Sequence, residues 1–317
     1  MQTPPNPDSG ALLFSQMLEI LINGLARGSV YALVALGYTM VYGILGMINF
    51  AHGEIFMIGM FAAVFALGAM GSAGLVAVGI TLPLAILLAM ALSAGFGVMN
   101  ERIAYRKLRG AHLLAPLTSA IGMSIVLQNF VMLSVTKGKV DFPRAVAQPL
   151  ANTTWSLGPV QLTALQAVIF ATTFALMCGL FWLVQRTRLG IALRAVAQDR
   201  TMASLCGMKV DRLIAFAFAL GSALAAAAGA MVAMYQGVLR FDSGYMIGLK
   251  AFTAAILGGI GNIPGAVLGG LIIGLTEDLT SYTIKSEWKQ TTAFAILILV
   301  LWLRPRGLLG ERVADKV

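Results

Sequence analysis

Charged residues are scarce in this chain, and their scarcity excludes an ordinary soluble domain. Only 11% of the 317 residues are Asp, Glu, Lys or Arg and 59% are hydrophobic, whereas soluble domains carry about 25% charged residues. Mean hydropathy is +0.86, and several apolar stretches reach about 20 residues, the length of a transmembrane helix. The composition therefore predicts an all-α, polytopic membrane helix bundle.

Reactive and metal-binding residues are equally few, which removes most classes of enzyme. The cysteines, Cys178 and Cys206, lie in an apolar run and in a basic loop, so a disulfide framework is not expected. The histidines, His52 and His112, have no further metal ligands near them in the sequence. No G-x-x-x-x-G-K-S/T or G-x-G-x-x-G motif occurs. We therefore expect no catalytic residue, metal, cofactor or ATP site in the chain itself.

The positive net charge does not indicate binding to nucleic acid. Lys and Arg number 22 against 13 Asp and Glu, but they cluster beside apolar runs, where they mark cytoplasmic loops. This rule places segments 100–112 and 185–212 and the Arg304–Arg306 end in the cytoplasm. The polar loop 137–161 and the segment 276–289 are then expected outside.

The apolar runs lie between two polar tails. Residues 1–11 hold three prolines and no basic residue, so we expect a disordered tail and not the charged start of a signal peptide. Residues 12–303 form the membrane domain, and 304–317 form a cytoplasmic C-terminal tail. Alternation from a cytoplasmic N-terminus, with 12–26 and 29–47 as separate runs, predicts about eight full spans plus a re-entrant segment.

The first unusual stretch is 38–54, where an apolar run breaks at glycines and then carries an amide, an imidazole and a carboxylate. Bare backbone at membrane depth occurs only where protein buries it or where it lines a wet cavity. An ionisable side chain there usually faces a bundle interior or a transport path. One interpretation makes Asn49, His52 and Glu54 part of a substrate path. The other makes 49–54 a short loop at the cytoplasmic surface.

The second break, 258–265, lies inside a segment, 250–276, that must begin and end outside if the C-terminus is cytoplasmic, so it enters and leaves the membrane on the outer side. Asn262 is a good N-cap and Pro264 suits a first helical turn. A half-helix would begin here at mid-membrane, with free N–H groups as a seat for a carboxylate. The substrate-path residues expected from this break are Gly258, Gly259, Gly261 and Asn262. Alternatively, the glycines only allow close helix packing.

Buried acids are few, which bears on the energy source. An ion-coupled carrier usually needs acids along its path, and the apolar runs offer only Glu19, Glu54 and His52, with Lys250 at an edge. This favours a transporter that is driven from its cytoplasmic side, with the basic loop 185–212 as the docking site for a separate motor. A self-contained secondary transporter or channel is the alternative.

Three blocks of the sequence are similar to one known family. They are 37–54 (GYTMVYGILGMINFAHGE), 188–207 (RLGIALRAVAQDRTMASLCG) and 250–265 (KAFTAAILGGIGNIPG). With them, the chain from about Met17 onward resembles the LivH-type permeases, inner-membrane subunits of bacterial ABC importers for leucine, isoleucine and valine. The resemblance implies a multi-pass permease in the bacterial inner membrane, and not an enzyme. A permease of a related importer, for urea, amides or other amino acids, is the alternative.

The resemblance also implies partners. These are a second homologous permease subunit that completes a heterodimer, two cytoplasmic ATPase subunits, a periplasmic amino-acid-binding protein and the lipid bilayer. Segment 190–207 resembles the coupling helix that ABC permeases insert into the ATPase, often written around an E-A-A…G pattern. The residues that would carry this role are Arg194, Asp199, Ala203 and Gly207. Gln198-Asp199 stands where Glu-Ala is expected, so the sequence departs from the pattern there.

Overall fold

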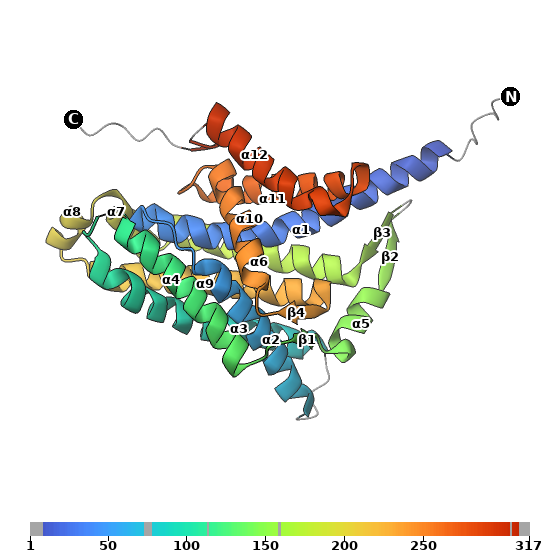
Figure 1. Cartoon of the computed structure of the whole chain (residues 1–317), viewed down its shortest axis with the longest axis horizontal. Coiled ribbons are helices and arrows are strands. Elements are labelled where there is room, and N and C mark those ends of the chain that lie inside the picture. The colour runs from blue at the N-terminus through green and yellow to red at the C-terminus, as the bar shows by residue number, and fades with distance from the viewer. Residues whose placement is uncertain (1–8, 73–77, 113, 158–159, 305, 311–317) are drawn as a thin grey trace.

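The chain is almost wholly helical in a computed structural model, which describes residues 9–72, 78–112, 114–157, 160–304 and 306–310 (Figure 1). The helices are α1 (Ser9–Leu45), α2 (His52–Ser72), α3 (Val78–Asn100), α4 (Leu114–Ser134), α5 (Arg144–Asn152), α6 (Ala164–Arg186), α7 (Arg188–Gln198), α8 (Arg200–Leu205), α9 (Val210–Gln236), α10 (Ser243–Gly258), α11 (Ile263–Thr283) and α12 (Lys289–Leu303). Short π- and 3-10-helical turns occupy Glu101–Tyr105, Arg106–Leu108 and Ser286–Trp288. The strands are β1 (Lys139–Asp141), β2 (Thr154–Leu157), β3 (Val160–Thr163) and β4 (Val238–Arg240). Of the expected tails, residues 1–8 and 311–317 lie outside the described residues, whereas 9–11 belong to helix α1 and are not a disordered tail.

Helix α1 is the centre of the bundle. Its 37 residues give a helix about 55 Å long, and 89% of its most apolar window is buried. It packs along α11 at glycines: a Cβ on Gly28 would lie 2.8 Å from the Cα of Leu271. Small residues at such a contact let two membrane helices approach closely, which is how packing replaces the hydrophobic effect in lipid.

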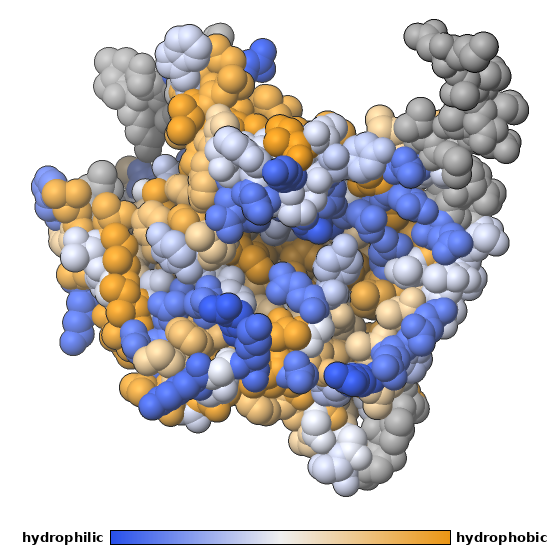
Figure 2. Space-filling model, turned by 45° about the vertical axis from the view of Figure 1, so that its right-hand side comes forward, coloured by the Kyte–Doolittle hydropathy of each residue, from blue (hydrophilic) through white to orange (hydrophobic). Residues whose placement is uncertain are grey.

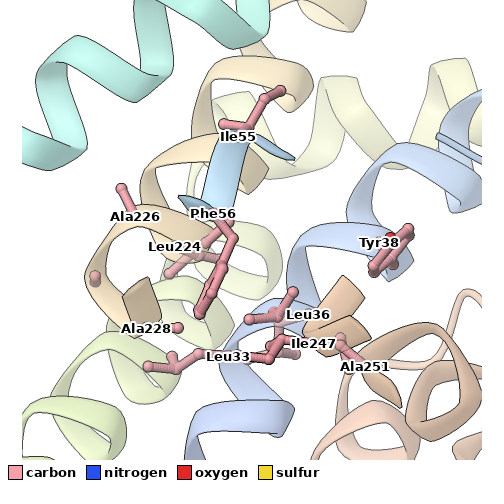
Figure 3. Close-up of a cluster of buried hydrophobic side chains, with 14 of the residues drawn as sticks. Leu33, Leu36, Tyr38, Ile55, Phe56, Leu224, Ala226, Ala228, Ile247 and Ala251 are labelled. Atoms are coloured by element: carbon pink, nitrogen blue, oxygen red, sulfur yellow. The ribbon is translucent and has the colours of Figure 1, made fainter. Parts of the chain in front are cut away.

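Helices α2 and α9 complete the core around α1. Figure 3 shows Phe56 of α2 beside Leu224 of α9, pointing toward Leu33 and Leu36 of α1, and the Phe56 side chain is fully buried. The alanine-rich middle of α9, residues 225–228, is wholly buried as well. Short side chains there allow close approach: a Cβ on Gly59 of α2 would collide with the Cα of Ala226 in α9.

The peripheral helices present an apolar surface. Only 22% of the apolar windows of α4 and α6 is buried within the chain, although their mean hydropathies are 1.5 and 2.2. On the face seen in Figure 2, apolar side chains cover much of the surface, and polar ones lie across its middle and lower parts. Such exposed apolar helices need lipid or another membrane subunit around them.

The short strands and α5 lie at the end of the bundle opposite α7 and α8 (Figure 1). Strand β1 pairs antiparallel with β4, with Lys139 opposite Arg240, and β2 pairs with β3. The loop expected outside over 137–161 is therefore structured. The basic segments gather at the other end, which the positive-inside rule assigns to the cytoplasm.

The expected division of 12–47 into two spans is wrong, because α1 is one continuous helix. Arg27, which ends the first apolar run, lies inside α1 and pairs with Asp278 of α11 at 3.2 Å, so its charge is compensated within the bundle. The hydroxyl of Tyr282 donates to Gln16 (3.0 Å) at the far end of α11. The start of α1 thus lies at the external end of the bundle, and not in the cytoplasm.

Seven of the described helices are long and apolar enough to cross a membrane: α1, α2, α3, α4, α6, α9 and α11. Helices α10 and α12 have only 16 and 15 residues. Helix α10 crosses α1 steeply in Figure 1, and the chain returns through α11, so the expected return over 250–276 is present. The expected half-helices are wrong, because α11 has 21 residues and is long and apolar enough to cross a membrane.

Candidate functional site

The first break in the sequence is the connection between α1 and α2. Helix α1 ends at Leu45, and Gly46 adopts a left-handed φ of 65° that other residues rarely tolerate. The loop then turns inward, and Asn49 is 2% exposed. Its side-chain oxygen accepts hydrogen bonds from Asn100 (3.2 Å) and from the Tyr105 hydroxyl (3.1 Å). These bonds tie the loop to the cytoplasmic end of α3.

His52 and Glu54 begin α2 deep within protein, with side chains that are each 1% exposed. The His52 ring lies against Tyr38, with ring centroids 4.6 Å apart, and against Gly37 of α1. Gly37 precedes the end of α1 by eight residues, which is about 12 Å along the helix axis. The loop between α1 and α2 therefore brings His52 back into the bundle, well away from the cytoplasmic surface.

The Glu54 carboxylate lies where α2, α4 and α10 meet. It accepts a hydrogen bond from the Ser124 hydroxyl at 3.3 Å. A Cβ on Gly244 would lie 2.8 Å from its other oxygen, which has no hydrogen-bond partner among the described residues. A buried carboxylate with an unsatisfied oxygen is costly, so its presence indicates a functional role.

The second break is a tight turn between α10 and α11. Gly259 and Gly261 have φ values of 103° and 96°, which only glycine adopts readily. The side-chain oxygen of Asn262 accepts from the Gly265 N–H at 2.9 Å, which confirms the predicted N-cap. A Cβ on Gly258 would collide with the Gly265 carbonyl, so glycine there lets the two helices meet.

The predicted depth of this turn is wrong. The Asn262 amide donates to the Leu309 carbonyl (3.0 Å), and the Leu309 N–H donates to the Gly258 carbonyl (3.0 Å). The segment after α12, beside Arg304 and Arg306, thus lies against the turn and places it at the cytoplasmic end. Because this segment occupies the turn, the start of α11 is not an open carboxylate seat at mid-membrane.

A cluster of buried and half-buried polar and charged residues, which the sequence did not predict, lies between α1, α10, α11 and the start of α12. Its members are Arg27, Tyr31, Lys250, Glu277, Asp278 and Lys289. Glu277 is 0% exposed, and it forms an ion pair with Lys250 at 2.7 Å and accepts a hydrogen bond from the Tyr31 hydroxyl at 2.8 Å. Asp278 pairs with Arg27 at 3.2 Å. We refer to these six residues as the outer charge cluster.

The segment 276–289, which we expected outside, is helical in its first half and lies at the external end of the bundle. Helix α11 continues to Thr283, so Glu277 and Asp278 lie inside a helix and are buried. Their cationic partners stand in other apolar runs, as Arg27 and Lys250. The sequence did contain a signal for this cluster: two isolated cations, Arg27 and Lys250, and one adjacent pair of acids, Glu277 and Asp278, all lie within or beside apolar runs.

Charged side chains also connect the elements at the cytoplasmic end. Arg109 pairs with both Glu101 and Asp211, which joins the end of α3 to the start of α9. The guanidinium of Arg200, in α8, donates to the carbonyls of Ile44 (2.9 Å) and Leu45 (2.6 Å). Burial, together with the nearby Arg109, lowers the pKa of Arg200 from its ordinary value.

The four residues expected at the ATPase contact shape the loop between α6 and α9. Arg194 donates to the Val184 carbonyl (2.9 Å), and Asp199 caps α8 by accepting from the Thr201 and Met202 N–H groups (2.8 and 3.0 Å). Ala203 is buried, and Gly207 ends α8 with a φ of 79°. These residues hold α7 and α8 in place.

The same loop exposes apolar side chains that sequence reasoning did not single out. Met202 and Leu205, one turn apart in α8, are 61% and 77% exposed, and Ile191 of α7 is 55% exposed. They lie among basic residues at the cytoplasmic end and not on a lipid-facing span. Exposed apolar residues outside the lipid-facing spans can serve as a contact surface for a protein partner.

A bundle of membrane-length helices, with a buried polar break at its core and an exposed helical loop at its cytoplasmic end, defines a multi-pass membrane transport protein. The model of the family described as the branched-chain amino acid transport system / permease component matches residues 20–301. The chain belongs to this family, and it is therefore a transport subunit and not an enzyme.

Known relatives match along nearly the whole chain. It is 46% identical over 300 residues to the high-affinity branched-chain amino acid transport system permease protein BraD of Pseudomonas aeruginosa, covering 95% of this chain and 98% of that protein. It is 45% identical over 310 residues to LivH of Escherichia coli, covering 96% and 99%. The autoinducer 2 import system permease protein LsrC of Yersinia pestis is more distant, at 27% over 237 residues, covering 68% of this chain and 65% of LsrC.

Proposed function

We propose that this chain is a permease subunit of an ATP-driven importer that carries leucine, isoleucine and valine across the bacterial inner membrane. The observation that supports this most is the full-length identity of 45–46% to permeases of high-affinity branched-chain amino acid transport. Since the sequence contains no nucleotide-binding motif, the energy would come from separate ATPases.

The complete importer would contain four further subunits. A second, homologous permease would complete a heterodimer, two ATPases would bind at the cytoplasmic face, and a periplasmic protein would deliver the amino acid. The apolar faces of α4 and α6, of which little is buried, are consistent with a membrane-embedded partner.

The test is uptake of radiolabelled leucine by cells that lack their own branched-chain transport. The chain is produced together with the ATPases, second permease and binding protein of neighbouring reading frames. We expect saturable leucine uptake that is lost when the Walker lysine of either ATPase is changed. Leucine accumulation by proteoliposomes that contain this chain alone, under a proton or sodium gradient, would favour a secondary transporter instead.

The ATPase contact is proposed at α7 and α8, on the exposed side chains of Met202 and Leu205. Arg194, Asp199, Ala203 and Gly207 would act by holding this helical pair in its docking orientation. A charge at Leu205 would have to be desolvated on docking, which costs several kcal/mol.

The proposed contact can be tested at one position. Leu205→Glu should abolish co-purification of the ATPases with the permease, while the matched variant Leu205→Met should retain it. Retention of the ATPases by Leu205→Glu at normal protein level would place their contact elsewhere.

The substrate path is proposed to pass the buried break between α1 and α2, along Asn49, His52 and Glu54. The turn formed by Gly258, Gly259, Gly261 and Asn262 would form the cytoplasmic end of this path. Both breaks lie where a small backbone rotation could move a whole helix, which is the usual place for a hinge.

A further inference from the structure

A cavity of about 340 Å³ opens beside the outer charge cluster. It lies between α1, α6, α9 and α10, near the external end of α9, where Gln236 forms part of its wall. Arg27, Tyr31 and Lys250 line one side. Pockets of about 300–1,000 Å³ are typical for small molecules, so the space suffices for one small ligand.

The charges at this cavity favour an anion. In the outer charge cluster the cations Arg27, Lys250 and Lys289 face only two carboxylates, Glu277 and Asp278. Arg27 and Lys250 line the cavity, whereas neither carboxylate does. A carboxylate that entered would meet two cations, and such charge-assisted hydrogen bonds are the strong ones in proteins.

The remaining walls fit an aliphatic group. Val30, Ile169 and Ile247 line the cavity and form a branched apolar surface, although little of each is exposed (4%, 1% and 9%). Gln236 and Ser243, also in the wall, carry oxygens that can accept hydrogen bonds from an ammonium group. The two cations match the carboxylate of an aliphatic α-amino acid, the apolar wall matches its side chain, and the oxygens of Gln236 and Ser243 match its ammonium group.

We propose that this cavity is a binding station in the outer half of the permease for the free aliphatic amino acid, with its carboxylate held between Arg27 and Lys250. This inference rests on the proposed function. Because Lys250 already pairs with Glu277 at 2.7 Å, the substrate carboxylate competes with a protein carboxylate. Binding is therefore weak, which suits a site that must release its ligand. Because a bound carboxylate draws Lys250 away from Glu277, it also loosens the contact between α10 and α11.

The test uses the complete importer in nanodiscs without the binding protein, so that only a site in the membrane complex is measured. Equilibrium binding of radiolabelled leucine is measured for the wild type and for Ile247→Phe. This substitution adds volume inside the cavity and leaves its charged residues in place. Ile298→Phe on α12, where Ile298 is 68% exposed, is the matched control. We expect Ile247→Phe to weaken leucine binding at least tenfold and Ile298→Phe to leave it unchanged.

Ligand analogues test the charge assignment. Leucinol, which lacks the carboxylate, should not displace leucine, whereas the carboxylate 4-methylpentanoate should. Equal displacement by both, or unchanged binding in Ile247→Phe, overturns the proposal. It is also overturned if native mass spectrometry shows a phospholipid that Ile247→Phe expels and leucine does not displace.

Failure of this inference can be told from failure of the proposed function. If the wild-type importer takes up leucine with its binding protein and Ile247→Phe does so at the same rate, the station is wrong and the function stands. If the assembled wild-type importer takes up no leucine, the proposed function itself is wrong.

Discussion

Replacing Arg200 by alanine should uncouple ATP hydrolysis from transport. Among the described residues, only the Arg200 side chain forms hydrogen bonds between α8 and the end of α1. Its two acceptors, the carbonyls of Ile44 and Leu45, belong to the last turn of α1 and lack intrahelical partners. The guanidinium therefore caps α1 at the point where the chain turns toward Asn49.

The magnitude follows from these two bonds. Each hydrogen bond to a charged group contributes about 1.5–3 kcal/mol. Losing both therefore weakens the attachment of α8 to α1 by at least about 3 kcal/mol, which is at least on the order of a hundredfold in the attached population. Arg200→Lys, which offers one compact ammonium in place of a fork, should lose about half of this free energy.

The assay is the number of ATP molecules hydrolysed per leucine imported by the complete importer in proteoliposomes. Arg200→Ala should raise that ratio severalfold, while ATPase binding stays intact. Arg102→Ala is the matched control, because Arg102 is an exposed arginine at the same end of the bundle, and among the described residues its side chain makes no hydrogen bond or ion pair. An unchanged ratio in Arg200→Ala would refute the reasoning.

Two further substitutions test the packing. A Cβ at Gly59 would collide with the backbone of Ala226 in α9, whereas one at Gly68, on the same helix, would meet open space. Because overpacking costs about 1–3 kcal/mol, Gly59→Ala should lower the midpoint of thermal unfolding in detergent and Gly68→Ala should not. Equal midpoints for the two variants would contradict the close contact. Asn262→Ala removes the N-cap of α11 and the hydrogen bond to Leu309. Because an N-cap contributes about 0.5–2 kcal/mol, the midpoint of thermal unfolding should fall. Asn262→Asp keeps the capping oxygen, so it should recover most of the loss.

Features with local causes could be predicted from the sequence. The cap at Asn262 needs only a side chain and a backbone N–H three residues later, and the structure confirms it. The membrane class follows from composition, and the basic segments do gather at one end of the bundle. The family resemblance, carried by three short blocks, agrees with the match over residues 20–301.

Features that depend on distant partners were missed. Arg27 marks a loop boundary by any local rule, and only its pairing with Asp278 shows that α1 continues through it. The depth of His52 follows from the hydrogen bonds that draw Asn49 toward Asn100 and Tyr105, which no spacing in the sequence records. The position of the α10–α11 turn likewise depends on Leu309, which follows in the chain only after α12.

The segment 307–310 has a consequence for biogenesis. Its residues follow α12 in the chain, yet Leu308 and Leu309 hydrogen-bond the carbonyls of Leu257 and Gly258 at 2.8 and 3.0 Å. These two hydrogen bonds can therefore form only after α12 and the residues that follow it have been synthesised. Until then, the turn between α10 and α11 lacks these two partners.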